Sequence, residues 1–219
     1  MRIFLIVIAA FLLTRTITAC KSSSSGPATF CDTACLKDTL KFVNETHPMH
    51  PHVYISARNC MADTLLWSFE DMGVNRKIGF ADVIGAAIHI NKNYIACFIK
   101  DTSYAWLKFN DCSTGRGYIL KVPYSRSQRM SYKSSALNSF DPKFAVADGL
   151  IAYSDRGNLF AEDEATGATA MMTFGSKVDI DYDAVHETVD SISVTRDKMW
   201  ARVKIGNEWK VVEKTVEFK

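Results

Sequence analysis

The sequence lacks a surplus of charge of either sign. It holds 26 Lys and Arg residues against 24 Asp and Glu residues, so the formal net charge of its 219 residues is +2. Proteins that bind nucleic acid usually present a strongly basic surface, and we therefore expect no nucleic-acid partner. The hydrophobic share of 47% is that of an ordinary globular protein, and the length allows one or two domains.

The sequence also lacks the short motifs of the common catalytic sites. It contains no G-x-S-x-G nucleophile elbow, no H-E-x-x-H zinc motif, no P-loop and no G-x-G-x-x-G turn after a strand. These absences favour a non-catalytic protein without a cofactor. A site assembled by folding from distant loops would escape such a search, so a hydrolase remains the alternative.

The chain opens with an apolar run that is too short to cross a bilayer. Met1 and Arg2 precede an apolar stretch over residues 3–12, whereas a membrane-spanning helix needs about 20 residues. A basic start, an apolar middle and an end of small residues are typical of a secretory signal peptide. We predict a signal peptide at residues 1–19.

The end of this segment, Ile17-Thr18-Ala19-Cys20, resembles the lipobox of bacterial lipoproteins. The resemblance implies that Cys20 is acylated and anchors the protein to a membrane, since two or three acyl chains hold a soluble domain there. Residues 20–29 are then the lipidated cysteine and a flexible polar tether. In that family an Asp directly after the lipidated cysteine often signals retention in the inner membrane. Lys21 stands at this position here, which favours the outer membrane, and the protein could lie on its periplasmic or its surface face. A cleaved signal peptide with Cys20 as a chance residue is the alternative.

Few cysteines follow Cys20. They are Cys31, Cys35, Cys60, Cys97 and Cys112. In a compartment that permits disulfides, this odd number leaves at least one thiol free or paired with another chain. Three residues separate Cys31 from Cys35, which is neither the thioredoxin-like spacing nor half of a zinc site. We expect Cys60 to pair with Cys31 or Cys35 and so join the N-terminal segment to the body.

Residues 30–219 consist of short apolar stretches separated by Gly, Asn and Asp, with almost no helical period. This pattern predicts a single all-β domain. A long polar interruption over residues 125–139 predicts a loop or an insert with a little helix. The expected strands are 39–43, 53–57, 64–69, 84–90, 94–100, 105–109, 118–122, 144–147, 150–153, 158–161, 168–174, 178–184, 191–195, 199–205 and 208–218.

An internal repeat organises this domain. Segments that start at His52, Tyr94, Leu150 and Ile192 each open with an apolar-x-apolar strand, then a polar turn and a strand rich in Trp, Phe or Leu. The starts are 42, 56 and 42 residues apart, and the polar interruption accounts for the longer interval. Such a period predicts about four units of about four strands each.

Residues 148–167 resemble a repeat of the quinoprotein-type β-propellers. Two strands cross a turn at Gly157 and Asn158, and a D-x-x-T-G turn, residues 163–167, precedes the next strand. The same turn recurs at residues 111–115. The resemblance implies a propeller-like domain of about four blades, and it implies no cofactor. An antiparallel β-sandwich or a meander built from the same hairpins is the alternative.

Two segments carry metal-ligand side chains. Within residues 47–52 stand His47, His50 and His52, and imidazole suits copper or zinc. The alternative for this segment is a solvated loop.

The second segment follows the register of a calcium-binding loop with Asp179, Asp181, Asp183 and Glu187, but it lacks the glycine that the sharp turn requires. We prefer to interpret residues 178–184 as a half-buried strand with a charged outer face.

Four tryptophans, Trp67, Trp106, Trp200 and Trp209, offer surfaces for a glycan or an apolar ligand. Aromatic residues at strand positions more often belong to a core, and we expect that here. The sequence thus predicts a membrane-anchored, non-catalytic β-repeat lipoprotein whose loops bind a protein or a glycan. The alternatives are a periplasmic hydrolase and a metal-handling lipoprotein that uses the three histidines.

Overall fold

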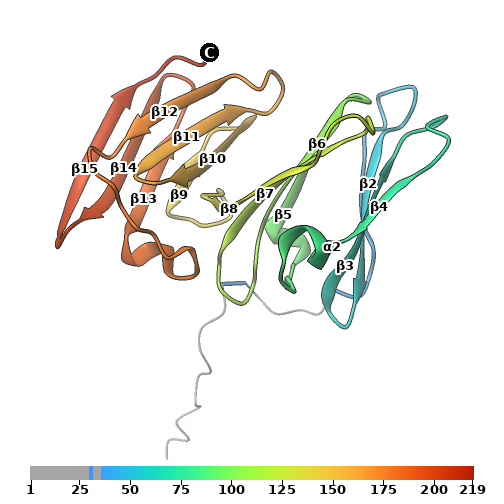
Figure 1. Ribbon diagram of the computed structural model, residues 1–219, viewed down its shortest axis with the longest axis horizontal. Helices are drawn as coiled ribbons and strands as arrows, with labels where there is room; N and C mark the ends of the chain where they lie inside the picture. Colours follow the sequence, from blue (N-terminus) through green and yellow to red (C-terminus); the bar gives the residue numbers. More distant parts are fainter. Residues whose placement is uncertain (1–29, 32–35) are drawn as a thin grey trace, which may run out of the picture.

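The computed structural model describes residues 30–31 and 36–219, and its architecture is all-β, as the sequence predicts (Figure 1). The expected signal peptide, Cys20, the tether and Cys35 lie outside the described residues. Phe30 and Cys31, at the start of the predicted domain, are described. Within the described ranges, no helix is both long enough and apolar enough to cross a membrane.

The strands form three sheets. The first has the order β1-β2-β3-β4, with β1 (Leu40–Val43), β2 (His52–Arg58), β3 (Met61–Ser68) and β4 (Arg76–Gly79). The second has the order β12-β11-β10-β8-β7-β6-β5, with β5 (Ile95–Lys100), β6 (Tyr104–Asn110), β7 (Gly117–Pro123), β8 (Ser131–Ala136), β10 (Leu150–Asp155), β11 (Asn158–Asp163) and β12 (Thr169–Thr173). The third has the order β15-β14-β13-β9, with β9 (Phe144–Val146), β13 (Val189–Val194), β14 (Lys198–Ile205) and β15 (Glu208–Thr215).

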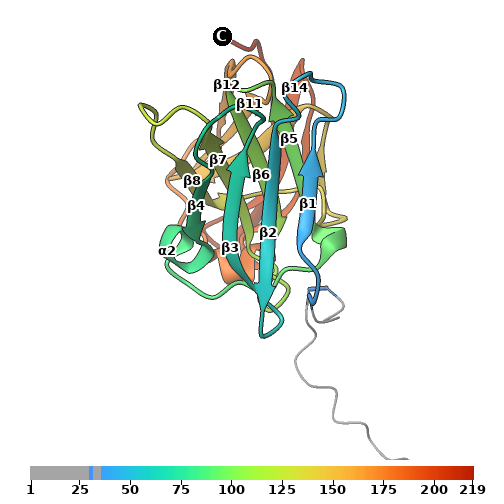
Figure 2. The ribbon, with the colours of Figure 1, turned by 90° about the vertical axis from the view of Figure 1, so that its right-hand side faces the viewer.

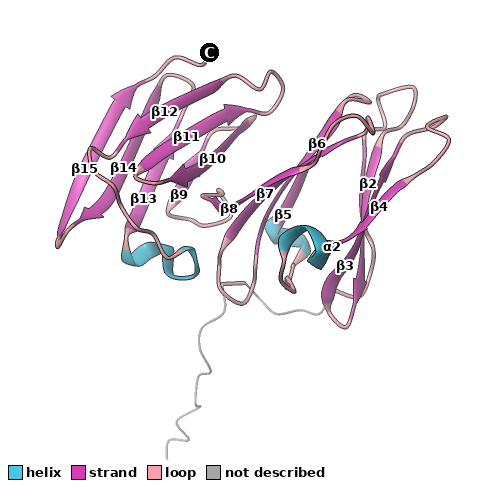
Figure 3. Ribbon diagram, in the orientation of Figure 1, coloured by secondary structure: helices cyan, strands magenta, loops and turns pink. Residues whose placement is uncertain are grey.

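Short helices lie in the connections. They are α2 (Phe80–Ile84), η1 (Lys92–Tyr94) and η2 (Tyr182–Glu187). Figure 3 shows that α2 and η2 lie toward the same edge of the row of sheets.

Four antiparallel meanders follow one another along the chain: β2–β3–β4, β5–β6–β7, β10–β11–β12 and β13–β14–β15. Two of the expected repeat starts, His52 and Leu150, are the first residues of β2 and β10. We call the strands β1–β4 group 1, β5–β8 group 2, β10–β12 group 3, and β9 with β13–β15 group 4. Groups 2 and 3 belong to one sheet because Tyr153 in β10 pairs with Ala136 in β8.

The four groups stand in a row from group 1 at one end to group 4 at the other (Figures 1 and 2). Alternate residues of each strand point to opposite faces, so Val53 and Ile55 of β2 share a core with Leu107 and Phe109 of β6. A second core joins group 3 to group 4. Both outer seams of the row are therefore closed by apolar side chains, which are the main source of its stability.

The two D-x-x-T-G turns have the same hydrogen-bonding pattern. In each, the aspartate side chain accepts hydrogen bonds from the backbone N–H and the hydroxyl of the threonine three residues later, Thr114 or Thr166. The glycine N–H donates to the aspartate carbonyl, and the glycine φ is +81° at Gly115 and +75° at Gly167. A side chain is strained at such a φ, which explains the glycine at this position of the motif.

Two expected strands are wrong. Residues 84–90 contain the end of α2 and irregular backbone, and residues 178–184 contain irregular backbone and the start of η2. Asp181 caps η2 by accepting a hydrogen bond from the N–H of Asp183. Val178 and Ile180 still pack against the core of groups 3 and 4, so their alternation reflects one buried side of a loop rather than a strand.

Two strands form where none was expected, at β4 and at β8. β8 lies in the polar interruption, where residues 125–139 predicted a loop or an insert with a little helix. Its first three residues, Ser131, Tyr132 and Lys133, are exposed, yet β8 pairs along β7. In the sheet order β8 lies between β7 and β10, but it pairs with β10 only at Ala136, its last residue. Its exposed first half requires little apolar surface, so the strand carries no hydrophobic alternation.

One of the two expected cysteine pairings, Cys31 with Cys60, is wrong, whereas the other, Cys35 with Cys60, stays a prediction because Cys35 lies outside the described residues. Cys31 forms a disulfide with Cys112, not with Cys60, and so joins the N-terminal segment to group 2. Cys60 is disulfide-bonded as well, and it forms an isolated β-bridge with Leu36. Cys97 in β5 has a free thiol whose pKa is raised by burial and, to a lesser degree, by the charge of Glu164.

Candidate functional site

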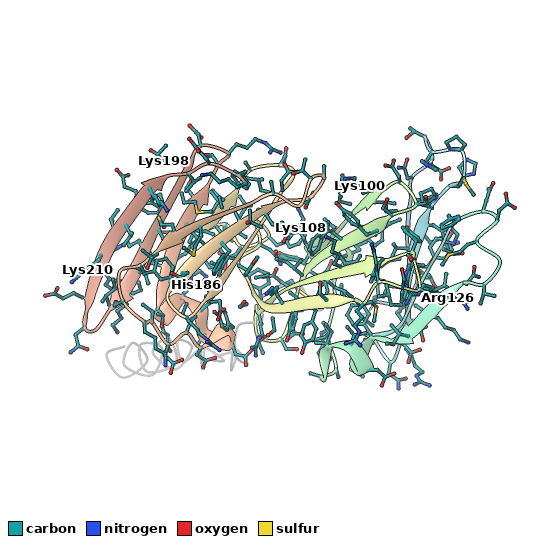
Figure 4. All side chains as sticks on the ribbon, turned by 45° about the horizontal axis from the view of Figure 1, so that its top comes forward. Lys100, Lys108, Arg126, His186, Lys198 and Lys210 are labelled. Carbon is teal, nitrogen blue, oxygen red and sulfur yellow. A yellow bond between two sulfur atoms is a disulfide. The ribbon has the colours of Figure 1, made fainter. Side chains whose placement is uncertain are left out.

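The seam between groups 2 and 3 differs from the two outer seams. Its buried apolar cluster consists of only Trp106, Ile119, Ala136 and Ile151. Partly buried Phe98, Tyr104 and Tyr153 pack against this cluster. Charged side chains also lie in the seam, among them Lys108, which Figure 4 shows where the two halves of the molecule meet. Lys108 pairs with Glu164 at 2.5 Å, and Glu164 is almost fully buried. The faces that meet here are therefore built for polar contacts rather than for tight apolar packing.

Strand register brings the seam residues together. In group 2, Trp106 of β6 lies opposite Lys121 of β7, and Lys121 lies opposite Ser131 at the start of β8. In group 3, Ile151 of β10 lies opposite Glu162 of β11. The neighbouring residues Leu107, Leu120, Ala152 and Ala161 point the other way, into the outer cores.

A cavity of about 120 Å³ opens in this seam, and we call it the Trp106 cavity. Its apolar walls are Trp106, Ile119, Ile151 and the rings of Tyr132 and Tyr153, and its polar groups include Lys121, Lys133, Ser131 and Glu162. Ile151 also lines a second cavity of about 180 Å³ beside Lys108 and Asn138. The two cavities therefore share a wall at the centre of the seam.

The indole N–H of Trp106 is a buried donor without an acceptor. Only 5% of Trp106 is exposed, and its Nε1 has no hydrogen-bond partner within the part of the chain that the structure describes. By contrast, Trp67 donates from Nε1 to the carbonyl of Pro123 at 2.8 Å. Buried donors are almost always satisfied in native proteins. Trp106 is also a lining residue of the Trp106 cavity, so its unsatisfied donor marks this region as a candidate binding site.

Two lysines and one glutamate set the charge of the cavity. The Nζ of Lys121 lies 3.8 Å from Oε1 of Glu162 and 4.6 Å from the centre of the Trp106 ring. The Nζ of Lys133 lies 4.8 Å from the centre of the Tyr153 ring. Burial raises the pKa of Glu162, and the charges of Lys121 and Lys133 oppose that rise. With two cations against one carboxylate, the cavity lining favours an anionic group.

Tyr104 and Tyr153 complete the aromatic surroundings. Tyr153 stacks on Phe160 with ring centres 5.2 Å apart, and Tyr104 packs edge-on against Trp106. Burial raises the pKa of both phenols, with nearby carboxylates such as Glu162 adding to the rise. Both phenols therefore stay neutral hydrogen-bonding groups beside the charged residues.

The structure does not bring the predicted histidine ligands together. His47 accepts a hydrogen bond from the N–H of Met49, His50 contacts Glu70 at 2.7 Å, and His52 stacks on Tyr54. Each imidazole thus has a separate local contact. Across residues 30–31 and 36–219, no group of three or more His, Cys, Asp or Glu side chains is arranged to hold a metal ion.

The predicted calcium ligands are also dispersed. Asp181 caps η2, and Asp183 lies 3.4 Å from Arg116 of group 2. Asp179 is exposed in the irregular segment before η2, and Glu187 is exposed at the end of η2. The loop register in the sequence therefore does not become a coordination shell.

Two further histidines, His89 and His186, lie near carboxylates, as the hydrolase alternative would require. Ser113 and Asp111 both approach Nδ1 of His89, at 3.0 Å and 4.0 Å, whereas a Ser–His–Asp relay needs them on opposite ring nitrogens. His186 contacts Asp141 at 2.7 Å through Nε2 and the carbonyls of Val189 and Asp190 through Nδ1. Neither histidine lies beside the Trp106 cavity, and both contacts hold loops in place.

Sequence reasoning expected Trp106 in a core, and its burial in an apolar cluster confirms this. It did not identify the other residues of the Trp106 cavity. A signal was present, because β6 and β7 carry Lys108 and Lys121 on a face that alternates with Leu107 and Leu120. A strand that is apolar on one face and mixed aromatic and basic on the other indicates two different neighbours.

No protein-family model matches the chain, and no curated protein matches it either.

Proposed function

We propose that this protein is a membrane-anchored, non-catalytic β-repeat lipoprotein that binds a glycan in the seam between groups 2 and 3. The observation that carries the binding role is the orphaned indole N–H of Trp106 at a cavity with aromatic and charged walls. Aromatic rings offer flat faces to the C–H groups of a sugar, and the polar groups around them match its hydroxyls.

The anchor in this proposal is Cys20 of the lipobox-like segment, with the outer membrane as the location. Acyl labelling of the protein in a bacterial host is expected to be strong in the wild type and lost in Cys20→Ser. Labelling that persists in Cys20→Ser would refute the anchor and leave the binding role untouched.

We further propose that the four groups correspond to four propeller-type units. Each group contains a three-stranded antiparallel meander; group 1 packs on group 2 and group 3 packs on group 4 through apolar cores, while groups 2 and 3 are joined within one sheet. The matching hydrogen bonds of the two D-x-x-T-G turns support a common ancestry for groups 2 and 3. In this arrangement the Trp106 cavity lies between two consecutive units, where neighbouring sheets leave room for a ligand.

A glycan array tests the binding role. The lipid-anchored protein in detergent micelles is expected to bind at least one neutral or acidic glycan, and Trp106→Phe is expected to weaken that binding about tenfold or more, since it removes one hydrogen bond to the ligand. The matched control is Trp209→Phe, because Trp209 is 41% exposed on β15, at the far end of the row. Absence of binding, or equal losses in both variants, would contradict the proposal.

A further inference from the structure

The charged residues that line the Trp106 cavity favour a ligand other than a neutral sugar. Lys121 reaches it from β7 and Lys133 from β8, while Glu162 reaches it from β11. Lys121 is within ion-pair distance of Glu162. Lys133 instead lies above the Tyr153 ring, and no described carboxylate lies within ion-pair distance of its Nζ. Lys121 and Lys133 thus share the single carboxylate of Glu162, and the lining described for the cavity carries one positive charge in excess.

The orphaned donor supplies the second element of an anion site. Trp106, whose buried indole N–H has no acceptor among the described residues, lines the same cavity as the two lysine side chains. An N–H and an ammonium that can both reach one carboxylate form charge-assisted hydrogen bonds with it, which are about twice as strong as neutral ones. The acceptor that Trp106 lacks is therefore best supplied by a negatively charged oxygen.

The other lining residues indicate the chemistry of the rest of the ligand. Glu162 accepts hydrogen bonds, so it suits a hydroxyl group, and Ile119, Ile151 and Tyr153 offer apolar surface to a ring face. The volume of about 120 Å³ is smaller than the roughly 150 Å³ that encloses a benzene ring. The cavity thus holds the charged end of a sugar, while the rest of the chain extends out of it.

We infer that the Trp106 cavity recognises the carboxylate of an acidic sugar, such as a uronic acid residue of an acidic glycan. In this arrangement Trp106 and Lys133 bind the carboxylate, Glu162 accepts a hydrogen bond from a ring hydroxyl, and Lys121 holds Glu162 in place. The inference rests on the proposed glycan-binding function and narrows it to one ligand class.

Calorimetric titration of the lipid-anchored protein in detergent micelles tests the inference. The probes are short oligosaccharides of galacturonate, of mannuronate, and of alternating glucuronate and N-acetylglucosamine, each with its methyl-esterified counterpart. At least one acidic oligosaccharide is expected to bind, and its ester is expected to bind about ten- to a hundredfold more weakly, because esterification removes the charge. Sodium acetate, the anion alone, is expected not to compete at the same concentration.

Two variants assign the effect to the cavity. Lys133→Gln is expected to remove the preference for the acid over the ester, whereas Lys210→Gln, on the far edge strand β15, is expected to keep it. Equal binding of acid and ester would overturn this inference and leave the glycan-binding function standing. Binding of neither form would overturn this inference, and the absence of binding on the glycan array as well would overturn the glycan-binding function. Competition by acetate would show a site for simple anions and would also overturn the inference.

Discussion

The guanidinium group of Arg196 donates a hydrogen bond to the carboxylate of Asp163 across the seam between groups 4 and 3, at 2.5 Å. The same turn is contacted from group 2, where the hydroxyl of Tyr104 donates to the carbonyl of Glu164 and the ammonium of Lys100 donates to that of Ala165. The D-x-x-T-G turn of group 3 therefore links three of the four groups. It also fixes the end of β11, the strand that carries Glu162 into the Trp106 cavity.

Replacing Asp163 is expected to destabilise the fold. Asp163→Ala removes the partner of Arg196 and leaves the N–H groups of Ala165 and Thr166 without their acceptor. Buried polar groups left in this way cost about 2 to 3 kcal/mol in the free energy of unfolding. Urea denaturation measures the loss. The control is Asp155→Ala in the same hairpin, because the exposed carboxylate of Asp155 forms an ion pair with its neighbour Arg156. A change of more than about 0.5 kcal/mol in the free energy of unfolding of this control would contradict the comparison.

The contribution of Asp163 is expected to disappear in acid. Hydrogen bonds from Arg196, then from Thr166, lower the pKa of Asp163 to about 2, whereas an aspartate in an unfolded chain titrates near 3.9. Because the folded pKa is the lower one, the stabilisation is complete above about pH 4 and is lost as the pH falls towards 2. Urea midpoints of the wild type and of Asp163→Ala, measured between pH 5 and pH 2, should converge. A constant difference over this range would refute the assignment.

Gly157 is expected to tolerate no side chain. Its φ is +89°, and a Cβ there would lie 2.2 Å from the carbonyl oxygen of Ser176. Gly157→Ala should therefore lower the free energy of unfolding by more than about 2 kcal/mol, since both the backbone strain and the clash act. Gly206→Ala separates the two causes, because Gly206 has a φ of +63° with open space around it, and it should cost about 1 kcal/mol. Equal losses in the free energy of unfolding for Gly157→Ala and Gly206→Ala would show that the clash at Gly157 contributes nothing.

The two buried tryptophans are expected to respond differently to truncation. Trp67→Phe loses the hydrogen bond to Pro123 and core volume, so it should cost about 2 kcal/mol or more. Trp106→Phe removes a donor that has no acceptor among the described residues. Without ligand, its cost in the free energy of unfolding should therefore be smaller than that of Trp67→Phe by at least about 1 kcal/mol. Thermal and urea denaturation compare them. A cost for Trp106→Phe as large as that for Trp67→Phe would point to a structural role for its N–H.

The all-β architecture could be predicted because most strands have one fully apolar face. The alternation of Val53 and Ile55, or of Leu159 and Ala161, gives the period of a strand directly. β8 could not be predicted in this way, since its first half is exposed and its pairing with β7 comes from the backbone. Residues 178–184 show the converse, because an alternating segment packs on a core without joining a sheet.

The Trp106 cavity could not be predicted for a different reason. Its walls come from five strands, and Trp106 and Glu162 are 56 residues apart in sequence. Only the stacking of group 2 on group 3 brings them together. The local pattern could show that Lys121 shares a strand face with Ile119, but not which side chains lie across from it.

The resonance of the Trp106 indole N–H tests the binding site most directly. In a ¹⁵N-labelled sample of the lipid-anchored protein in micelles, Trp106→Phe assigns that resonance by its disappearance. Addition of the acidic oligosaccharide that binds is predicted to move it downfield and to saturate, because the N–H gains a charged acceptor, while the Trp209 indole stays in place. A Trp106 resonance that remains unchanged at saturating ligand, or that responds equally to the methyl ester, would contradict the acidic-sugar site.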